Sequence, residues 1–317
     1  MRRGRLGGAV GLAVGAGGTA NAAPASGSQA GDGARMSSPG ATGVRFATYN
    51  VRTSHLNNKW AGDPDAKYDR DDAARMERVA TFIKNKNLHI IAVQEVRHDE
   101  RRGIMKHLPK NFYASGVKGR SDTAIIWNAK AWKHLDTGRF DVRIRKTVTR
   151  PQVWMKLQHR RSGQRIVSSL HLAAGDKREH LRIAGAERTV RKMRRVANGL
   201  PFVVAGDING NDRTRGRMGA YRVFKGAGLT YTRYLPKYRF GNHCDSHNGR
   251  AGHGKQECRA NGRGSHIDMV FVSKALRVGS YNLVANARTS RTSDHNPLIP
   301  QLWVKRQLTG AIYPAGR

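Results

Sequence analysis

Acidic residues are scarce in this 317-residue sequence, which has 22 Asp and Glu against 58 Lys and Arg and a formal net charge of +36. An excess of one sign works against self-association, so we expect a monomer, and it favours polyanionic partners such as nucleic acid or an anionic lipid surface. The hydrophobic share of 38% still allows a sizeable core, which excludes a wholly disordered basic protein.

Long hydrophobic runs are also missing, so no transmembrane helix and no stable membrane insertion are predicted. The N-terminus has the order of a secretory signal, with three arginines, a weakly apolar stretch from Leu6 to Gly18 and then small residues. We therefore predict a signal peptide over residues 1–23 and a secreted protein. Residues 24–43 are rich in Gly, Ser, Ala and Pro, which predicts a flexible linker ahead of one folded domain over residues 44–317.

Cysteine is scarce too. The two cysteines, Cys244 and Cys258, lie in a polar stretch rich in Gly, Asn and His. In an exported protein an even pair predicts a disulfide. The alternative is a metal site shared with His243, His247 or His253, which the lack of CxxC spacing disfavours.

Strand-like and helix-like segments alternate from Val44 onward. Between the predicted strands Val44–Val51 and His89–Val96, apolar residues with i, i+3, i+4, i+7 spacing from Met76 to Ile83 predict a helix. A second, very basic helix is predicted over Lys177–Ala197. Many strands with few helices between them predict an α/β protein in which helices cover packed sheets. Further strands are predicted at Thr123–Trp127, Gln152–Gln158, Arg165–Leu172, Phe202–Ala205, Ile267–Val272, Tyr281–Ala285 and Leu298–Val304.

Polar side chains recur where these apolar strands begin or end. Taken singly, each could be a turn former, a capping residue or a buried histidine with satisfied hydrogen bonds. Taken together, they are what a site assembled across a sheet edge requires. They are Asn50, Glu95, His171, Asp207, Asn209, Asp268, Asp294 and His295.

In order and register, these residues resemble the endonuclease/exonuclease/phosphatase superfamily of metal-dependent phosphodiesterases, over nearly the whole predicted domain. The resemblance implies a four-layer α/β/β/α sandwich, two packed mixed sheets flanked by helices, with the site at one end of the sheets. The matching motifs are Thr48-Tyr49-Asn50, Gln94-Glu95, Ser169-Leu170-His171, Gly206-Asp207-Ile208-Asn209, His266-Ile267-Asp268 and Ser293-Asp294-His295.

Two further motifs resemble the deoxyribonuclease I branch of that superfamily. They are Gln94-Glu95-Val96-Arg97 and Arg150-Pro151. The resemblance implies that Arg97 contacts DNA and that Arg150 faces the region of the scissile phosphate.

The resemblance also implies catalytic roles. His295 would be the general base toward the attacking water, oriented by Asp268, and a histidine suits this role because its pKa can lie near neutral pH. His171 would act near the leaving group or a non-bridging oxygen, while Asp207 and Asn209 would hold the water and the phosphate oxygens. A carboxylate near Ser121-Asp122 orients the second histidine in this branch, and Asp122 is the candidate, with the register there open by one residue.

Metal ligands follow from the same resemblance. Glu95 is the leading ligand, supported by Asn50 and by Asp294 or Asp207. Oxygen ligands with few charges fit a hard, partly hydrated cation, Mg²⁺ first, with Mn²⁺ or Ca²⁺ as substitutes, and disfavour zinc.

The basic residues behind several of the site strands favour nucleic acid as substrate, because phosphate contacts supply affinity with little sequence information. We therefore predict a DNA endonuclease of low sequence specificity, with RNA as a possible substrate. A sphingomyelinase-type lipid phosphodiesterase would need an exposed apolar hairpin, whereas aromatic residues make up only 7% and those in Thr230–His266 alternate with Arg and Lys. A phosphomonoesterase would not need so extended a basic field. A non-catalytic nucleic-acid-binding protein on the same scaffold would be expected to have lost part of the polar set.

Overall fold

The computed structural model describes residues 42–53, 72–116, 122–160, 165–168, 170–248, 258 and 264–304. The predicted signal peptide, residues 1–23, lies outside the described residues, and so does the predicted linker, residues 24–43, up to residue 41. The first strand, β1 (Thr42–Asn50), begins at the end of that linker.

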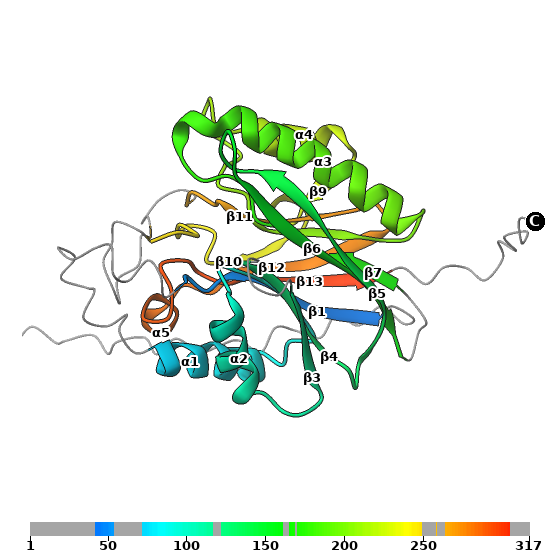
Figure 1. The fold of residues 1–317 in the computed structure, drawn as a ribbon, viewed down its shortest axis with the longest axis vertical. Helices are drawn as coiled ribbons and strands as arrows, with labels where there is room; N and C mark the ends of the chain where they lie inside the picture. Colours follow the sequence, from blue (N-terminus) through cyan, green and yellow to red (C-terminus); the bar gives the residue numbers. More distant parts are fainter. Residues whose placement is uncertain are drawn as a thin grey trace, which may run out of the picture. The chain divides into compact units, whose positions relative to one another are not determined.

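Two layers of β-structure form the middle of the folded unit (Figure 1). One is a seven-stranded sheet in the order β10-β12-β13-β1-β2-β4-β3. The other consists of the sheets β8-β11-β9 and β5-β6-β7, which an isolated parallel bridge between His171 and Asp207 joins. Besides β1, the seven-stranded sheet contains β2 (Ile90–Gln94), β3 (Phe112–Gly116), β4 (Thr123–Asn128), β10 (Tyr238–Phe240), β12 (Leu276–Leu283) and β13 (Leu298–Val304). The second layer contains β5 (Trp132–Arg143), β6 (Thr149–His159), β7 (Arg165–Ser168), β8 (Val203–Asp207), β9 (Thr230–Tyr231) and β11 (Asp268–Val272).

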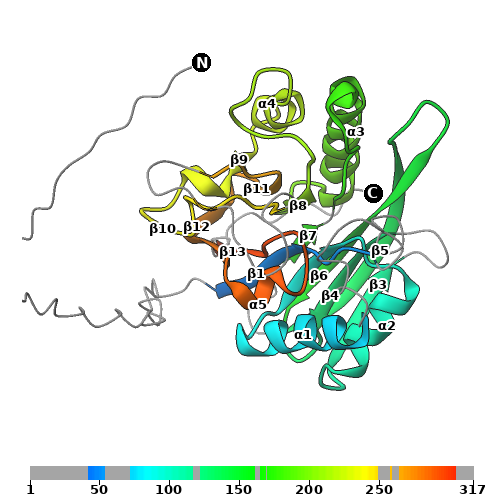
Figure 2. The same ribbon diagram turned by 90° about the vertical axis from the view of Figure 1, so that its left-hand side faces the viewer.

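Helices cover the outer face of each layer (Figures 1 and 2). The seven-stranded sheet is covered by α1 (Asp72–Asn85) and α2 (His98–Lys106), and the second layer by α3 (Glu179–Ala197) and α4 (Gly219–Gly226). A single helical turn, α5 (Ala287–Ser290), lies beside α1. The predicted α/β/β/α order of layers is confirmed. Among the described residues, no helix is both long and apolar enough to span a bilayer.

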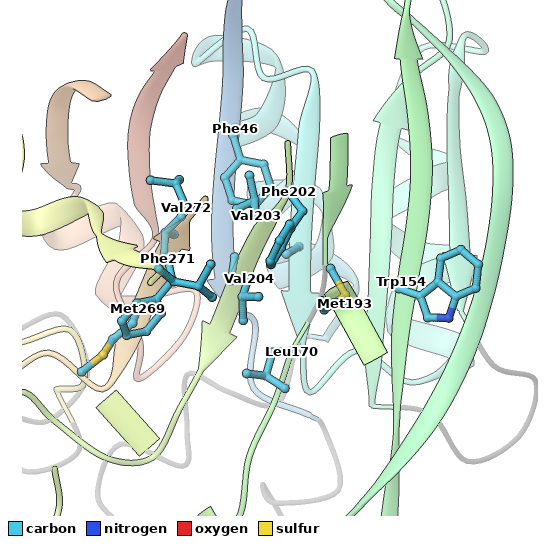
Figure 3. Close-up of a cluster of buried hydrophobic side chains, with 14 of the residues drawn as sticks. Phe46, Trp154, Leu170, Met193, Phe202, Val203, Val204, Met269, Phe271 and Val272 are labelled. Atoms are coloured by element: carbon cyan, nitrogen blue, oxygen red, sulfur yellow. The ribbon is translucent and has the colours of Figure 1, made fainter. Parts of the chain in front are cut away.

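Alternation along the central strands builds two cores. In β1, Phe46 belongs to the apolar cluster between the layers, whereas Ala47 and Tyr49 belong to the cluster beneath α1. Figure 3 shows Phe46 of one layer close to Val203 of β8, in the facing layer, and to Phe202, which precedes β8. Fully burying a large apolar side chain contributes about 1.5–3 kcal/mol, so these clusters hold the layers, and thereby the strand ends, in register.

A buried arginine on α1 joins this helix to the loops at the same end of the sheets. The Arg75 side chain is fully buried and pairs with the Asp72 carboxylate at 2.9 Å. Its guanidinium also donates to the backbone oxygens of Thr292, at 3.0 Å, and of Val51, at 2.8 Å, and to that of Arg52. A buried charge persists when it is paired and hydrogen-bonded in this way, so α1 is anchored to the segments that precede His295 and follow Asn50.

Candidate active site

Strand ends from both layers meet at one end of the sandwich. β1 and β2 run parallel with Asn50 opposite Gln94, so Asn50 and Glu95 leave the seven-stranded sheet at the same edge. In the second layer, antiparallel pairing places Asp207, at the end of β8, opposite Asp268, at the start of β11. The sequence pattern had predicted such a site from the polar residues at strand ends, and the register supplies the physical reason.

Glu95 adopts a backbone conformation that few non-glycine residues adopt, with φ of 54°. The Thr53 amide donates to Glu95 Oε2 at 3.2 Å, and the Val51 amide donates to the Gln94 carbonyl at 3.0 Å. Such conformations cost free energy and persist when the surrounding structure holds them. Here the turn directs the Glu95 carboxylate across the sheet edge toward Asn50.

Asn50 is fully buried at the centre of the site. Its Nδ2 atom lies 3.1 Å from Glu95 Oε1, 3.2 Å from Asp207 Oδ2 and 3.3 Å from His295 Nε2. Its Oδ1 atom accepts a hydrogen bond from the Arg52 amide at 3.0 Å. In this orientation Asn50 acts as a donor between the other polar groups, and ligation of a metal through its oxygen, as predicted, would require the amide to turn over.

The side-chain atoms that could bind a metal at this site fit a divalent cation. Ligand atoms of Glu95, Asp207 and His295 all lie within 4.8 Å of one another. Two carboxylate oxygens, Glu95 Oε1 and Asp207 Oδ2, converge on the single Asn50 Nδ2 atom, so negative charge is concentrated in the cluster. Burial raises the pKa of the Asp207 carboxyl, as does the nearby Asp268, against the opposing effect of His295 and His171. A cation bound by Glu95 and Asp207 would offset this cost of burying negative charge.

His295 is held by a carboxylate, as predicted. Its Nδ1 atom lies 2.9 Å from Asp268 Oδ2, and its backbone amide donates to Ser293 Oγ at 3.1 Å. Burial alone would lower the pKa of the imidazole, but the carboxylates of Asp268, Asp294 and Asp207 raise it well above its usual value. With Nδ1 directed at Asp268, the Nε2 atom points into the site, and it can take up a proton when the imidazole is in its neutral form.

A second histidine faces Asp207 from the opposite side. His171 Nε2 lies 3.6 Å from Asp207 Oδ2, and His171 Nδ1 lies 3.4 Å from Asp122 Oδ2. Asp122 is also paired with Arg150 Nε at 2.8 Å, and Arg150 Nη1 donates to the Leu172 carbonyl at 3.0 Å. Burial would raise the pKa of Asp122, but His171 and Arg150 lower it. The carboxylate next to His171, whose register the sequence left open by one residue, is therefore Asp122. Arg150 pairs with this carboxylate.

Asp294, a predicted metal ligand, does not belong to the cluster of potential ligands around Glu95. Its Oδ2 atom lies 3.7 Å from His247 Nε2, and Asp294, His247 and His295 form a second group of potential ligands. Burial would raise the pKa of Asp294, but the hydrogen bond from His247 and the charge of His295 lower it. The residue placed with Glu95 in the structure is Asp207, which the sequence assigned mainly to holding water and phosphate.

His247 is the site residue that the sequence missed. Its ring centroid lies 4.6 Å from that of His295, although the sequence suggested it only as an alternative ligand beside the cysteines. The predicted disulfide between Cys244 and Cys258 is present. No local pattern places His247 at the site, because the contact depends on how residues 246–248 pair with Asp268 and with the residues that precede β13.

The segment around His247 supports both carboxylates next to His295. Ser246 Oγ accepts hydrogen bonds from the backbone amides of Ile267, at 2.9 Å, and Asp268, at 3.0 Å. The Asn248 amide donates to the Asp294 carbonyl at 2.6 Å. The position of His295 relative to its neighbours thus depends on this segment.

Two remaining predicted residues lie at the border of the site. Asn209 has φ of 52°, its amide donates to Asp207 Oδ1 at 2.8 Å, and its Nδ2 donates to the Leu172 carbonyl at 3.3 Å. Its side chain therefore supports the Asp207 turn. Arg97 is the residue before α2, two positions after Glu95, and is partly exposed.

The model of the endonuclease/exonuclease/phosphatase family matches residues 47–295. This range begins within β1 and ends at His295, so it contains every element that contributes to the site. The chain belongs to the endonuclease/exonuclease/phosphatase family. Members of the family are metal-dependent phosphoesterases, so a phosphoester hydrolase that uses a divalent metal is the activity consistent with this membership.

Solved structures of the family share the fold at low sequence identity. A family member from Bacteroides vulgatus is 22% identical, with a TM-score of 0.67, over 83% of this chain and 100% of the other. A mannosyl-6-phosphatase from Bacteroides thetaiotaomicron is 20% identical, with a TM-score of 0.65, over 82% and 99%. TDP2 from D. rerio, in complex with a single-strand DNA product, is 14% identical, with a TM-score of 0.58, over 82% and 99%. No curated protein matches the chain by sequence.

Proposed function

We propose that this family member is a secreted, metal-dependent nuclease that cleaves DNA internally with low sequence specificity. The observation that carries the proposal is the His295 and Asp268 pair beside the cluster of Glu95 and Asp207. Hydrolysis of a phosphodiester needs an activated water, neutralisation of developing negative charge and help for the leaving oxygen. The residues of this site match each requirement.

The proposed chemistry begins with the attacking water. His295 Nε2 removes a proton from the water, and Asp268 stabilises the imidazolium that forms. Glu95 and Asp207 would hold the cation, Mg²⁺ in preference to Mn²⁺ or Ca²⁺, which supplies charge neutralisation at the phosphate when bound. His171, held between Asp207 and Asp122, is placed to assist the leaving oxygen or to bind a non-bridging oxygen.

The net charge of +36 favours a polyanionic substrate over a small one. Arg97 is proposed to contact the DNA backbone beside the metal cluster. Arg150 is proposed to act closer to the scissile phosphate, where its pairing with Asp122 fixes its position. A DNA-bound relative with the same fold is compatible with this substrate, and the mannosyl-6-phosphatase shows that the fold also serves phosphomonoesters.

A lipid phosphodiesterase is the second candidate, favoured by one exposed apolar edge. Strand β10 lies at the edge of the seven-stranded sheet, and there Tyr238 is 49% and Phe240 53% exposed. Leu235, three positions before Tyr238 in the sequence, is also exposed. In the sequence, Lys237 and Arg239 alternate with these aromatic residues. Aromatic and basic residues in alternation suit either an anionic membrane surface or unpaired bases.

The discriminating experiment offers the purified protein four substrates: plasmid DNA, RNA, sphingomyelin vesicles and a phosphomonoester. Each is incubated with Mg²⁺ and with EDTA, and His295→Ala is tested in parallel. The proposal requires Mg²⁺-dependent conversion of supercoiled DNA to nicked or linear forms, and loss of this conversion in the variant. Cleavage of lipid or of phosphomonoester alone would replace it with the corresponding alternative, and DNA binding without any cleavage would leave a binding protein.

A further inference from the structure

The seven-stranded sheet has an open outer face at its β10 end. Tyr281 of β12 belongs to the core between the layers, so its neighbours Ser280 and Asn282 face outward. The pairing of β10 with β12 places Tyr238 opposite Ser280. It places Phe240 opposite Asn282, so both rings lie on the outer face. Both rings are about half exposed, and Figure 2 shows α1 and α2 away from β10.

A third aromatic ring lies on the same face. Gln301 of β13 pairs with Ser280, so Gln301 and Trp303, two positions further on, also face outward. A Cβ atom at Gly279 of β12 would lie 2.7 Å from Trp303 Nε1, and one at Gly43 of β1 would lie 3.4 Å from the indole ring. Glycines on both neighbouring strands therefore leave room for the indole, which extends across the sheet and is partly exposed.

Polar side chains lie among these rings. Ser280, Asn282 and Gln301 are partly exposed, and their hydroxyl and amide groups can donate and accept hydrogen bonds. A membrane would bury these groups in hydrocarbon without hydrogen-bond partners, which costs free energy. The edges of unpaired bases would supply such partners. The polar groups thus favour nucleic acid over lipid on this face.

Exposed cations border the rings. Lys237 Nζ lies 5.9 Å from the centroid of the Tyr238 ring, and Arg239 is the next residue of β10. Arg277 of β12 pairs with Trp303. All three cations are exposed. Cations beside aromatic rings suit a strand whose phosphates they bind while its bases stack, and they work against a second copy of this basic chain.

The open face leads toward the catalytic cluster. The last residue of β12, Leu283, pairs with Leu298 of β13. Leu298 in turn pairs with Thr48, two positions before Asn50 of the site. Because β10 runs parallel to β12 and ends at Phe240, it ends toward the site. Three strand spacings, about 14 Å, separate β10 from β1.

We propose that this open face binds the unpaired bases of a nucleic acid strand that reaches the His295 site. The inference rests on the proposed nuclease activity and narrows its substrate, because paired bases cannot stack on the rings. Single-stranded nucleic acid is then preferred over duplex. Aromatic rings on an open sheet face stack two or three bases in other single-strand binders. The open face consists of Tyr238, Phe240, Ser280, Asn282, Gln301 and Trp303.

The test measures binding to the whole chain in EDTA, so that no strand is cut. The probes are a short fluorescent oligothymidylate, a duplex of the same length and phosphatidylglycerol vesicles. Tyr238→Ala/Phe240→Ala removes two half-exposed rings, and Tyr238→Phe/Phe240→Tyr keeps both rings. Tyr113→Ala/Leu135→Ala is the matched control, because it removes two exposed apolar side chains from β3 and β5. All three variants keep the net charge.

We expect Tyr238→Ala/Phe240→Ala to weaken oligothymidylate binding about tenfold or more, the effect of losing at least one stacked base. Duplex binding by this variant should stay within about twofold of that by the unmodified chain, as should oligothymidylate binding by the other two variants. With Mg²⁺ present, the KM for oligothymidylate cleavage should rise in the alanine variant with little change in kcat.

Equal oligothymidylate affinity in all four proteins would overturn the open face as a binding surface, even if the unmodified chain cleaves DNA. An equal loss of duplex binding in the alanine variant would overturn its assignment to unpaired bases. Lost vesicle binding with unchanged oligothymidylate binding would assign the face to a membrane instead. A chain that cleaves no nucleic acid would overturn the proposed function, whereas the binding measured in EDTA would still decide the role of the open face.

Discussion

Asp268 faces His295 at 2.9 Å and at the same time stands opposite Asp207 in the β8 and β11 ladder. One strand pairing therefore fixes the carboxylate that orients the proposed base and the carboxylate proposed to bind the metal. The two groups cannot shift independently, because the register of two hydrogen-bonded strands sets their separation.

Replacing Asp268 with asparagine should remove the charge that stabilises the imidazolium of His295 while keeping the side-chain volume. We expect kcat to fall roughly 10²- to 10⁴-fold, the usual contribution of general acid–base catalysis, with a smaller change in KM. Steady-state cleavage of plasmid DNA measures both constants. Asp141→Asn on the exposed face of β5 is the matched control, and equal activity of the two variants would contradict the role of Asp268.

Removing the metal or its leading ligand should have parallel effects. EDTA should abolish hydrolysis, and added Mg²⁺ should raise the melting temperature, because a ligand at a hundred times its Kd stabilises the folded state by about 2.7 kcal/mol. Glu95→Gln should remove most of this Mg²⁺-dependent shift. Glu77→Gln, on the exposed side of α1, should retain it. A full shift in Glu95→Gln would show that the cation binds elsewhere.

The two arginines carried over from the deoxyribonuclease branch should differ in their effects. Arg97→Ala removes a proposed backbone contact, so DNA binding should weaken and its salt dependence become shallower by about one phosphate charge. Arg150→Ala removes the partner of Asp122 near His171, so turnover should slow with less effect on binding. Binding at several salt concentrations and single-turnover cleavage separate the two. Wild-type kinetics in both variants would contradict the roles inferred for Arg97 and Arg150 from the deoxyribonuclease branch.

Loss of the disulfide should affect activity as well as stability. Cys244 and Cys258 are 14 positions apart in the sequence, and the segment between them contains Ser246, His247 and Asn248 next to the site. We expect Cys244→Ser/Cys258→Ser to lower the free energy of unfolding by about 2–4 kcal/mol and to lower kcat at temperatures where the variant is folded. Urea unfolding and cleavage assays check the two effects. Unchanged kcat would show that Asp268 and Asp294 keep their positions without the crosslink.

Acid should destabilise the fold through His89, which precedes β2 at the end of the strand away from the site. Burial, together with the charges of Arg45 and His159, lowers the pKa of His89 from 6.5 to about 4. Between these two values the unfolded chain binds a proton that the folded chain does not, so stability falls as the pH drops from 6.5 toward 4. His89→Gln should flatten this part of the profile. Urea midpoints at pH 7.5 and pH 4.5 measure the difference, and identical pH profiles would contradict the assignment.

Much of the fold and most of the site were predictable from sequence, because buried strands with periodic apolar residues are strong signals. The strands that carry Asn50, Glu95, Asp207 and Asp268 lie where they were predicted. The predicted basic helix Lys177–Ala197 starts at Glu179 instead, after a short 3-10 turn over Asp176–Arg178.

The parts that were not predicted depend on tertiary contacts. β5 was missed because it carries mostly exposed side chains over Trp132–Arg143, which gives it little apolar periodicity. α2 was missed because only Glu100 and Ile104 are buried in a helix of nine residues. Within the site, Asp207 lies beside Glu95, and Asp294 lies beside His247. Both arrangements depend on the direction that the side chains take after their strands end. No local pattern specifies that direction.

The buried guanidinium of Arg75 links helix α1 to the backbone segments that carry the site residues. Its hydrogen bonds reach the backbone after Asn50 and the backbone before Asp294, so unwinding of the first turns of α1 would release both segments together. Local unfolding of this one helix would therefore abolish activity while most of the sandwich stayed folded. Heat or denaturant should then extinguish activity ahead of global unfolding.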